Sequence, residues 1–195
     1  MVITLLNQKG GVGKSTVSYL LACALKAAHV DVSILDLDPQ GTLASAARRL
    51  GEIPLANDRS TPIVIQDTAG HLDLDNPVNR AATMTVIQES DRILLISEMS
   101  LPCVEAAATT AAFLKTYQRP ESKALVVWNK VRVGTSTGQQ DQSELAKAVG
   151  LPGAKNWLPL ASCYEDTLAI GYGPALKGKP ALRKIIEALA LEVLA

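Results

Sequence analysis

Close to the N-terminus, residues 9–16 read KGGVGKST and bring together glycines, lysines and hydroxyl side chains. Glycines let the backbone turn tightly and aim several N–H groups at phosphate oxygens, and a helix that begins at once adds the attraction of its N-terminus for an anion. Lys14 would then reach the β and γ phosphates, the Ser15 hydroxyl would bind Mg²⁺, and Thr16 would lie near the α-phosphate. The segment therefore predicts a cradle for a nucleoside triphosphate, formed by Gly10, Gly11, Val12, Gly13, Lys14, Ser15 and Thr16.

Two residues set this loop apart from the common phosphate loop, GxxxxGK[ST]. Gln8 stands where that pattern has its first glycine, and Lys9 adds a second lysine. The second lysine has two interpretations: an additional cation aimed at charge that develops in the reaction, or a solvent-facing side chain on the outer side of the loop. The residues alone leave both interpretations open.

Two carboxylates, Asp36 and Asp38, follow an apolar run in the sequence LDLDPQG. Alternate residues of a strand point to the same side, and ligands of open α/β sheets bind at the C-terminal ends of the strands. A carboxylate at such a place can position or deprotonate the water that attacks a phosphate. We favour this role over the alternative, an aspartate of a turn or a helix cap.

Polar residues also end two later apolar runs. Asp67 follows IVIQ and precedes TAG, a pattern typical of the Walker B aspartate, which would hold Mg²⁺ through a water molecule. Asn129 follows VVW and is a candidate to hydrogen-bond the nucleotide base, although a turn asparagine is an equally good interpretation.

The elements expected to position these residues are short apolar runs, which alternate along the chain with segments of helical spacing. The runs are almost continuously hydrophobic, which is typical of strands buried on both faces of a parallel sheet. The alternation predicts one doubly wound, mostly parallel α/β sheet with helices on both faces, in a single domain of residues 1–195. The expected strands are Val2–Asn7, Asp31–Leu35, Pro62–Gln66, Arg92–Ser97, Ala124–Asn129 and Asn156–Leu160. The expected helices are Ser15–Ala28, Thr42–Leu50, Val78–Glu89, Val104–Tyr117, Gln142–Val149 and Ala181–Leu194.

Composition narrows the class of protein. The formal net charge is zero, so any nucleic-acid binding must come from a local patch. The three cysteines are far apart and form no CxxC pair, which argues against a disulfide framework or a zinc site and favours a cytoplasmic protein with reduced, buried thiols. The sequence shows no signal-peptide pattern at its start and no apolar stretch of membrane-spanning length.

KGGVGKST, LDLDPQG and IQDTAG, in this order, resemble the ParA/MinD family of deviant-Walker P-loop ATPases, and the ParA partition and positioning branch in particular. The resemblance implies that Lys9 crosses an ATP-bound dimer to the partner's nucleotide, while Lys14 acts as the conventional lysine. It implies that Asp38 activates water, that Asp36 helps at the metal through a water or at the switch, and that Asp67 is the Walker B acid. Asn129 is similar in place to the asparagine that contacts adenine.

The resemblance also implies a working cycle. ATP and Mg²⁺ close a homodimer, the dimer binds DNA non-specifically, and a ParB-like or other small adaptor stimulates slow hydrolysis and release. Such a cycle partitions or positions plasmids, chromosomes or protein cargo in the cytoplasm, in association with the nucleoid. No operator-binding domain is expected here, because the first strand begins at Val2. The candidate DNA contacts are Lys177, Lys179, Arg183 and Lys184, with Arg48 and Arg49 as a smaller second group.

Other members of the same broad class remain as alternatives. A MinD-like membrane regulator would end in a basic amphipathic helix, whereas residues 181–195 mix Arg183 and Lys184 with glutamates and many alanines. An iron–sulfur carrier would need paired cysteines, and Cys103 has no second cysteine placed to join it. A small-molecule kinase would need a substrate motif, which we do not find. An ATP-switched scaffold acting without DNA is the alternative nearest to the main interpretation. His71 is expected to be a surface-loop residue and not a catalyst.

Overall fold

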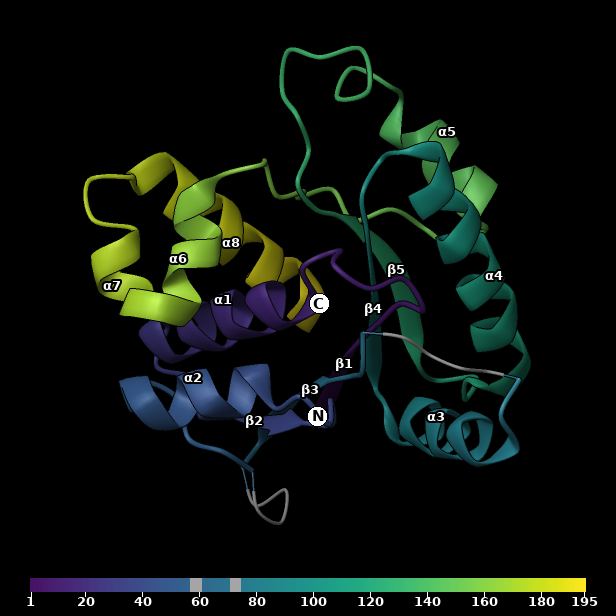
Figure 1. Cartoon of the computed structure of the whole chain (residues 1–195), viewed down its shortest axis with the longest axis horizontal. Coiled ribbons are helices and arrows are strands. Elements are labelled where there is room, and N and C mark those ends of the chain that lie inside the picture. The colour runs from purple at the N-terminus through teal and green to yellow at the C-terminus, as the bar shows by residue number, and fades with distance from the viewer. Residues whose placement is uncertain (57–60, 71–74) are drawn as a thin grey trace.

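One five-stranded sheet forms the centre of the computed structural model, which describes residues 1–56, 61–70 and 75–195 (Figure 1). All pairings between its strands are parallel, and the strand order is β2-β3-β1-β4-β5. The strands are β1 (Val2–Leu6), β2 (Val32–Asp36), β3 (Ile63–Asp67), β4 (Arg92–Ser97) and β5 (Lys123–Trp128). The helices are α1 (Lys14–Ala27), α2 (Thr42–Leu50), α3 (Pro77–Glu89), α4 (Leu101–Tyr117), α5 (Gln142–Val149), α6 (Ser162–Ile170), α7 (Tyr172–Ala175) and α8 (Pro180–Leu194).

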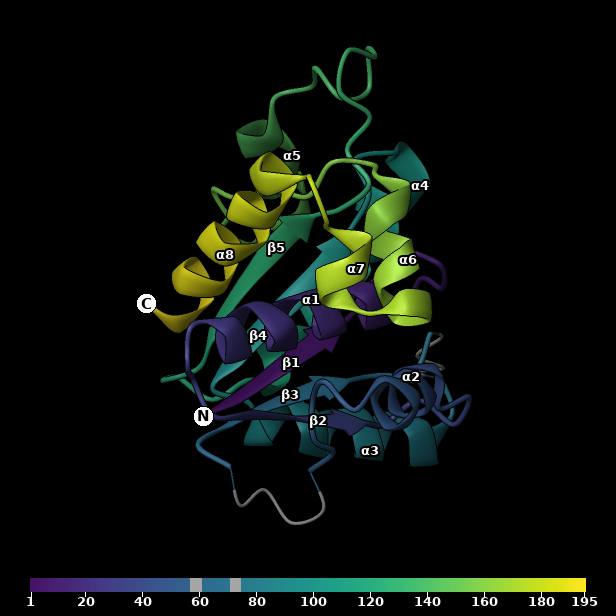
Figure 2. The same ribbon diagram turned by 90° about the vertical axis from the view of Figure 1, so that its left-hand side faces the viewer.

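Helices cover both faces of this sheet, as Figures 1 and 2 show from two directions. On one face α1 packs against β1, β2 and β3 and is itself covered by α6 and α8, with α2 beside it. On the other face α4 packs on β4 and α5 on β5, and α3 lies beside α4. The predicted doubly wound α/β fold with a parallel sheet is therefore confirmed.

Burial explains why these apolar runs became inner strands. The β3 residues are all buried, and so are all residues of β4 except its first. The apolar side chains of β4 divide between two hydrophobic clusters, one under α1 that contains Tyr19 and one under α4 and α5 that contains Trp128, whereas Ile63 and Ile65 of β3 belong to the first. A strand with an apolar cluster on each side gains from burying every residue, which is why the runs are continuous and not alternating.

The expected strand over residues 156–160 is wrong. This stretch makes a single described bridge, between Val131 and Pro159, with backbone hydrogen bonds from Leu158 and Leu160 around it. Its first residue, Asn156, is bonded instead to the Glu192 carboxylate of α8, so the pairing does not extend into a strand. The segment runs past the C-terminal end of β5 and does not lengthen the sheet.

Two helices, α6 and α7, were not predicted. The α6 sequence, SCYEDTLAI, mixes charged, aromatic and apolar residues without a clear apolar stripe, and its buried members include Thr167. The four-residue α7 is too short for a periodic pattern. Helix α4 begins three residues before the expected Val104, because Ser100 is its N-cap and Pro102 fits the first turn.

The other expectations stand as follows. Cys23, Cys103 and Cys163 are buried and free of disulfides. Within the described ranges, no helix has both the length and the apolar character needed to cross a membrane. His71 lies outside the described residues.

Candidate nucleotide-binding site

The loop between β1 and α1 presents a row of unengaged backbone donors. Among the described residues, no hydrogen-bond acceptor is paired with the N–H groups from Gly10 to Thr16, and the first α1 bond of this kind comes from Val17 to the Gly13 carbonyl. Gly11 and Gly13 have φ angles of 78° and 91°, in the left-handed region that glycine tolerates. Successive N–H groups that follow such residues form a concave nest for an anion. The predicted phosphate cradle therefore has the geometry to bind phosphates.

Steric contacts also require a glycine at position 13. A Cβ at this position would collide with the side-chain nitrogen of Asn129. That nitrogen donates a hydrogen bond to the Val12 carbonyl at 2.8 Å. Any larger residue at position 13 would thus break a contact that holds the loop in place.

Lys14 is buried at the base of this loop, with only 5% of its surface exposed. Its ammonium group donates to the Asn7 carbonyl at 3.2 Å. Burial lowers the pKa of Lys14, and the nearby Asp67 and Asp38 carboxylates oppose that effect. A buried cation with one neutral partner is poised to bind an anion, because the anion would supply the charge compensation that solvent does not.

Asp67, at the end of β3, is fully buried. Its Oδ1 accepts a hydrogen bond from the Ser18 hydroxyl at 3.1 Å, whereas no described group is bonded to its Oδ2. Burial raises the Asp67 pKa to about 6, against hydrogen bonds from Ser15 and Ser18 that lower it, while the Asp36 charge raises it further. An unpartnered buried carboxylate oxygen beside the Ser15 hydroxyl is a donor set that fits a hard, oxygen-seeking cation such as Mg²⁺.

Asp36 stands beside Asp67, since the two are register partners on β2 and β3. Each of its carboxylate oxygens already accepts a backbone N–H: Oδ1 from Asp38 at 3.0 Å and Oδ2 from Ala44 at 2.8 Å. Ala44 lies in the first turn of α2, whose own N-cap, Gly41, has no side chain. Asp36 therefore caps α2 from the end of the neighbouring strand.

Asp38 joins two loops. Its Oδ1 accepts from the Gln40 N–H at 2.9 Å, and its Oδ2 accepts from the Gly70 N–H at 3.2 Å. Because Gly70 follows β3, this carboxylate connects the segment after β2 with the segment after β3. Asp38 is half-buried and faces the cavity described next.

A cavity of about 760 Å³ lies over the loop. Gly10, Gly11, Gly13, Lys14, Ser15 and Thr16 line it, together with Asp38 and residues that follow β2 and β3. Lys9, by contrast, is not among the lining residues; its backbone N–H donates to the Asn7 side chain at 3.0 Å. The structure thus separates the two lysines of the loop, one inside the cavity and one outside its lining.

Comparison with known proteins agrees with this geometry. Residues 3–161 match CbiA, the CobQ/CobB/MinD/ParA nucleotide binding domain. The chain belongs to this family.

Individual relatives support the same assignment. A maintenance of carboxysome distribution protein A from Gloeobacter kilaueensis is 32% identical over 128 residues, which make up 60% of this chain and 56% of that protein. The match therefore spans little more than half the length of that relative.

Two solved structures share the fold. A Cyanothece McdA variant in complex with ATP has 15% identity and a TM-score of 0.67, with coverage of 98% of this chain and 96% of that chain. The septum site-determining protein MinD of Pyrococcus horikoshii OT3, in complex with Mg-ADP, has 16% identity and a TM-score of 0.68, covering 98% and 95%.

In this family member the end of β5 braces the phosphate loop. Asn129 holds the Val12 carbonyl, and the Lys130 ammonium group donates to the Gly11 carbonyl at 3.1 Å. Lys130 also pairs with Glu165 of α6, with 3.3 Å between Nζ and Oε1, and both side chains line the nucleotide cavity. Neither Lys130 nor Glu165 is predicted from the sequence as a site residue. Lys130 had a signal, its place after Asn129 at a strand end, but no spacing links Glu165 to the loop.

The candidate DNA contacts lie near the start of α8. Lys177, Lys179 and Lys184 are exposed, whereas the Arg183 guanidinium lies 5.4 Å from the centre of the Tyr172 ring. In the second group, Arg49 donates to the backbone carbonyls of Leu168 and Ala169. These contacts engage Arg183 and Arg49, whereas the three lysines and Arg48 are exposed.

Proposed function

We propose that this chain is a Mg²⁺-dependent ATPase that dimerises on binding ATP and positions cargo inside the cell. The observation that carries the proposal is the row of N–H groups from Gly10 to Thr16, which have no partner among the described residues, with the buried Lys14 beneath it. The family assignment supports a nucleotide, and the ATP and Mg-ADP in the two structural relatives support ATP and Mg²⁺ as the ligands.

The residues present fit a magnesium ion. Ser15 would bind it directly, and the free Oδ2 of Asp67 would accept a hydrogen bond from one of its water ligands. When bound, Mg²⁺ would neutralise negative charge on the phosphate oxygens. Asp36 stays a candidate for a second water-mediated contact, although its present bonds favour the role of a cap for α2.

Asp38 is the proposed group that orients or deprotonates the attacking water. It lines the same cavity as the phosphate loop, and its two backbone contacts fix the direction of its carboxylate. A positioned general base of this kind contributes roughly 10²–10⁴-fold to a hydrolysis rate.

Lys9 is proposed to serve the nucleotide of a second copy of the chain. It belongs to the phosphate loop and yet does not line the cavity of its own chain. Exposed apolar side chains lie near the same edge of the sheet, including Leu37 between the two β2 aspartates and Leu101 at the start of α4. An apolar surface next to an ATP site would be buried by a face-to-face dimer.

The proposed cargo is a large protein assembly or a DNA molecule, reached through a small adaptor protein. The carboxysome-distribution relative favours a protein assembly, while plasmid or chromosome partition is the other form of the same activity. Non-specific DNA would be held by Lys177, Lys179 and Lys184, with Arg183 beside them, in a cytoplasmic protein associated with the nucleoid. A regulator that acts without DNA is the second candidate, favoured by the zero net charge and by the engagement of Arg183 with Tyr172.

One set of variants tests this proposal. With ATP and Mg²⁺, Asp38→Ala should elute as a dimer in light-scattering chromatography, and the double variant Asp38→Ala/Lys9→Ala should elute as a monomer that still binds ATP. A monomer in both cases would rule out the ATP-dependent dimer.

DNA retention by the trapped dimer separates the two candidate functions. Retention that requires ATP and falls steeply with salt supports the positioning ATPase, and replacing Lys177, Lys179 and Lys184 by alanine should weaken it. Lack of retention even at low salt would favour the regulator that acts without DNA.

A further inference from the structure

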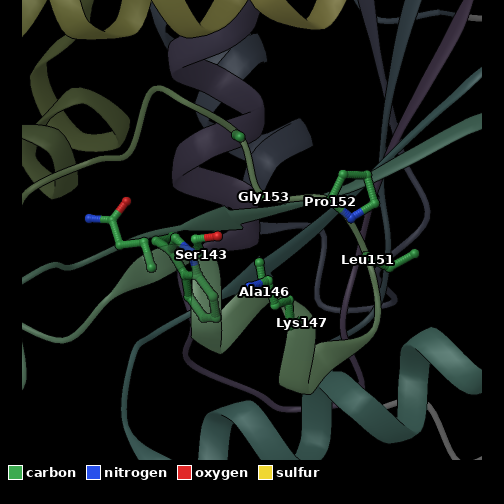
Figure 3. Close-up of a pocket in the computed structure, with 9 residues that line it drawn as sticks. Ser143, Ala146, Lys147, Leu151, Pro152 and Gly153 are labelled. Atoms are coloured by element: carbon green, nitrogen blue, oxygen red, sulfur yellow. The ribbon is translucent and has the colours of Figure 1, made fainter.

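A second cavity lies at the β5 edge of the sheet, between α5 and the stretch 151–154 (Figure 3). Figure 3 shows Ser143, Ala146 and Lys147 on α5, across from Leu151, Pro152 and Gly153. The cavity measures about 240 Å³ and shares no lining residue with the nucleotide cavity. A single water molecule needs only ~10–15 Å³ by the same measure, so this space is large enough for an organic group.

A buried hydrogen-bond donor in its wall has no partner. The Trp128 side chain lines the cavity and is fully buried, and no described group accepts a hydrogen bond from its Nε1. Buried indole N–H groups are almost always paired, because leaving one unpaired costs free energy. An acceptor brought into the cavity would recover that free energy.

Gly153 keeps this space open next to the indole. A Cβ at Gly153 would lie 4.0 Å from Trp128 Nε1 and 3.2 Å from the Ala146 methyl group. The glycine and the alanine are thus the two small residues that let α5 and the 151–154 stretch approach each other closely beside the indole donor.

The polar side chains around the cavity all carry hydrogen-bond donors. Besides the indole, the Ser143 hydroxyl, the Gln142 amide and the Lys147 ammonium group line it, and among the described residues no aspartate or glutamate does. The Lys147 ammonium group also donates a hydrogen bond to the Glu144 carboxylate, one turn earlier on α5, at 2.6 Å. The remaining wall is apolar and includes Ala146, Leu151 and Pro152. Donors above an apolar wall match a short aliphatic group that ends in a carboxylate.

We propose that this cavity binds a short aliphatic carboxylate, with the alkyl group against Ala146, Leu151 and Pro152 and the carboxylate accepting from Trp128 Nε1 and Ser143. Two sources offer this chemistry: a free small acid, and the C-terminal residue of a partner chain. The site is independent of the proposed ATPase activity, because binding can be measured without nucleotide.

The test uses isovalerate as the probe and the indole ¹H–¹⁵N signals of the full-length protein as the readout. The sequence has two tryptophans, Trp128 and Trp157, so Trp157 serves as an internal control. Isovalerate should shift the Trp128 signal and leave that of Trp157 in place, with a dissociation constant on the order of 1 mM, as expected for a ligand of this size. The alcohol 3-methylbutanol, which lacks the carboxylate, should bind at least roughly tenfold more weakly.

Two variants at the exposed Ser143 keep the test independent of folding. Ser143→Ala should weaken isovalerate binding several-fold by removing one donor, and Ser143→Leu should abolish it by filling the mouth of the cavity. Trp128→Phe, which keeps an aromatic ring without the N–H, should weaken binding about tenfold, measured by calorimetry.

A third probe, N-acetyl-leucine, imitates the end of a protein chain and distinguishes between the two sources of the ligand. Binding at least as tight as that of isovalerate assigns the site to a chain terminus, and binding of isovalerate alone assigns it to a free acid. A Trp128 signal that no probe shifts, or a shift that Ser143→Leu leaves unchanged, would show that the cavity holds water only and would overturn the proposal.

Discussion

The ends of β2 and β3 carry carboxylates at neighbouring register positions, and yet the two places differ in almost every physical respect. Asp67, on β3, is fully buried, has one oxygen without a described partner, and has a raised pKa. Asp36 and Asp38, on the β2 side, are half-buried, and each of their four oxygens accepts a backbone N–H.

This difference indicates that the two strand ends have different roles, and we refer to it as the division between them. The β3 end holds a charge that the apo protein does not fully satisfy, so it is prepared for a ligand and lowers stability until that ligand arrives. Backbone N–H groups of the loops already bond to the carboxylates at the β2 end. These carboxylates therefore help to set the conformation of the loops after β2 and β3. Four predictions test this division, beginning with the largest expected effect.

Asp38→Ala should lower the rate of ATP hydrolysis by roughly 10²–10⁴-fold, since it removes the proposed general base. ATP affinity should stay within a few-fold of the wild type, because Asp38 holds loops and does not hold phosphate. Phosphate release and titration of a fluorescent ATP analogue measure the two quantities. A loss of affinity as large as the loss of rate would mean that the β2 end belongs to the binding site.

Lys14→Ala should weaken ATP binding by about 10²–10³-fold or more, because it removes a buried charge that pairs with the triphosphate. The matched control is Lys9→Ala, which changes the lysine outside the cavity lining and should leave the affinity of the monomer nearly unchanged. Equal losses in the two variants would contradict the separation of the two lysines.

Asp67→Asn should stabilise the apo protein at neutral pH while weakening Mg²⁺-dependent ATP binding. The pKa of Asp67 rises from 3.8 to about 6 on folding, so the folded state holds this proton more tightly than the unfolded state does. Stability therefore falls as the pH rises through this window, by up to ~3 kcal/mol.

Thermal unfolding without magnesium, followed from pH 4 to pH 8, checks this prediction. The asparagine variant should lose the pH-dependent decline, and its advantage should shrink towards pH 4. A variant less stable than the wild type at pH 8 would show that ionised Asp67 is well solvated in the apo state.

Asp36→Ala should destabilise the fold by about 1 kcal/mol, the usual loss for a helix cap, and should change hydrolysis less than Asp38→Ala does. Asp36→Asn keeps one acceptor oxygen and should lose about half as much. Urea unfolding measures both. Unchanged stability combined with a large loss of Mg²⁺-dependent activity would move Asp36 from the helix cap to the metal.

The five strands of the sheet, and the glycine-rich loop that precedes α1, were predicted correctly from the sequence because each is a local property. A run such as Arg92–Ser97 needs only its own apolar residues to identify a buried strand. KGGVGKST needs only the backbone freedom of its glycines and the helix that follows. The stretch 156–160 failed the same reasoning, because apolar composition alone does not show whether a neighbouring strand pairs with a segment over more than one bridge.

By itself, then, the sequence determined the parallel α/β class and identified the residues proposed to hold a triphosphate and its metal. Only the tertiary structure decided that Asp36 would cap α2, that Asn129 and Lys130 would brace the phosphate loop, and that Glu165 would reach Lys130. Except for Asp36 and Ala44, which are eight positions apart, these contacts join residues separated by tens of positions or more, and strand order and helix packing bring them together. Local backbone preferences are encoded within a few residues, whereas partners across a sheet are fixed only when the whole core packs.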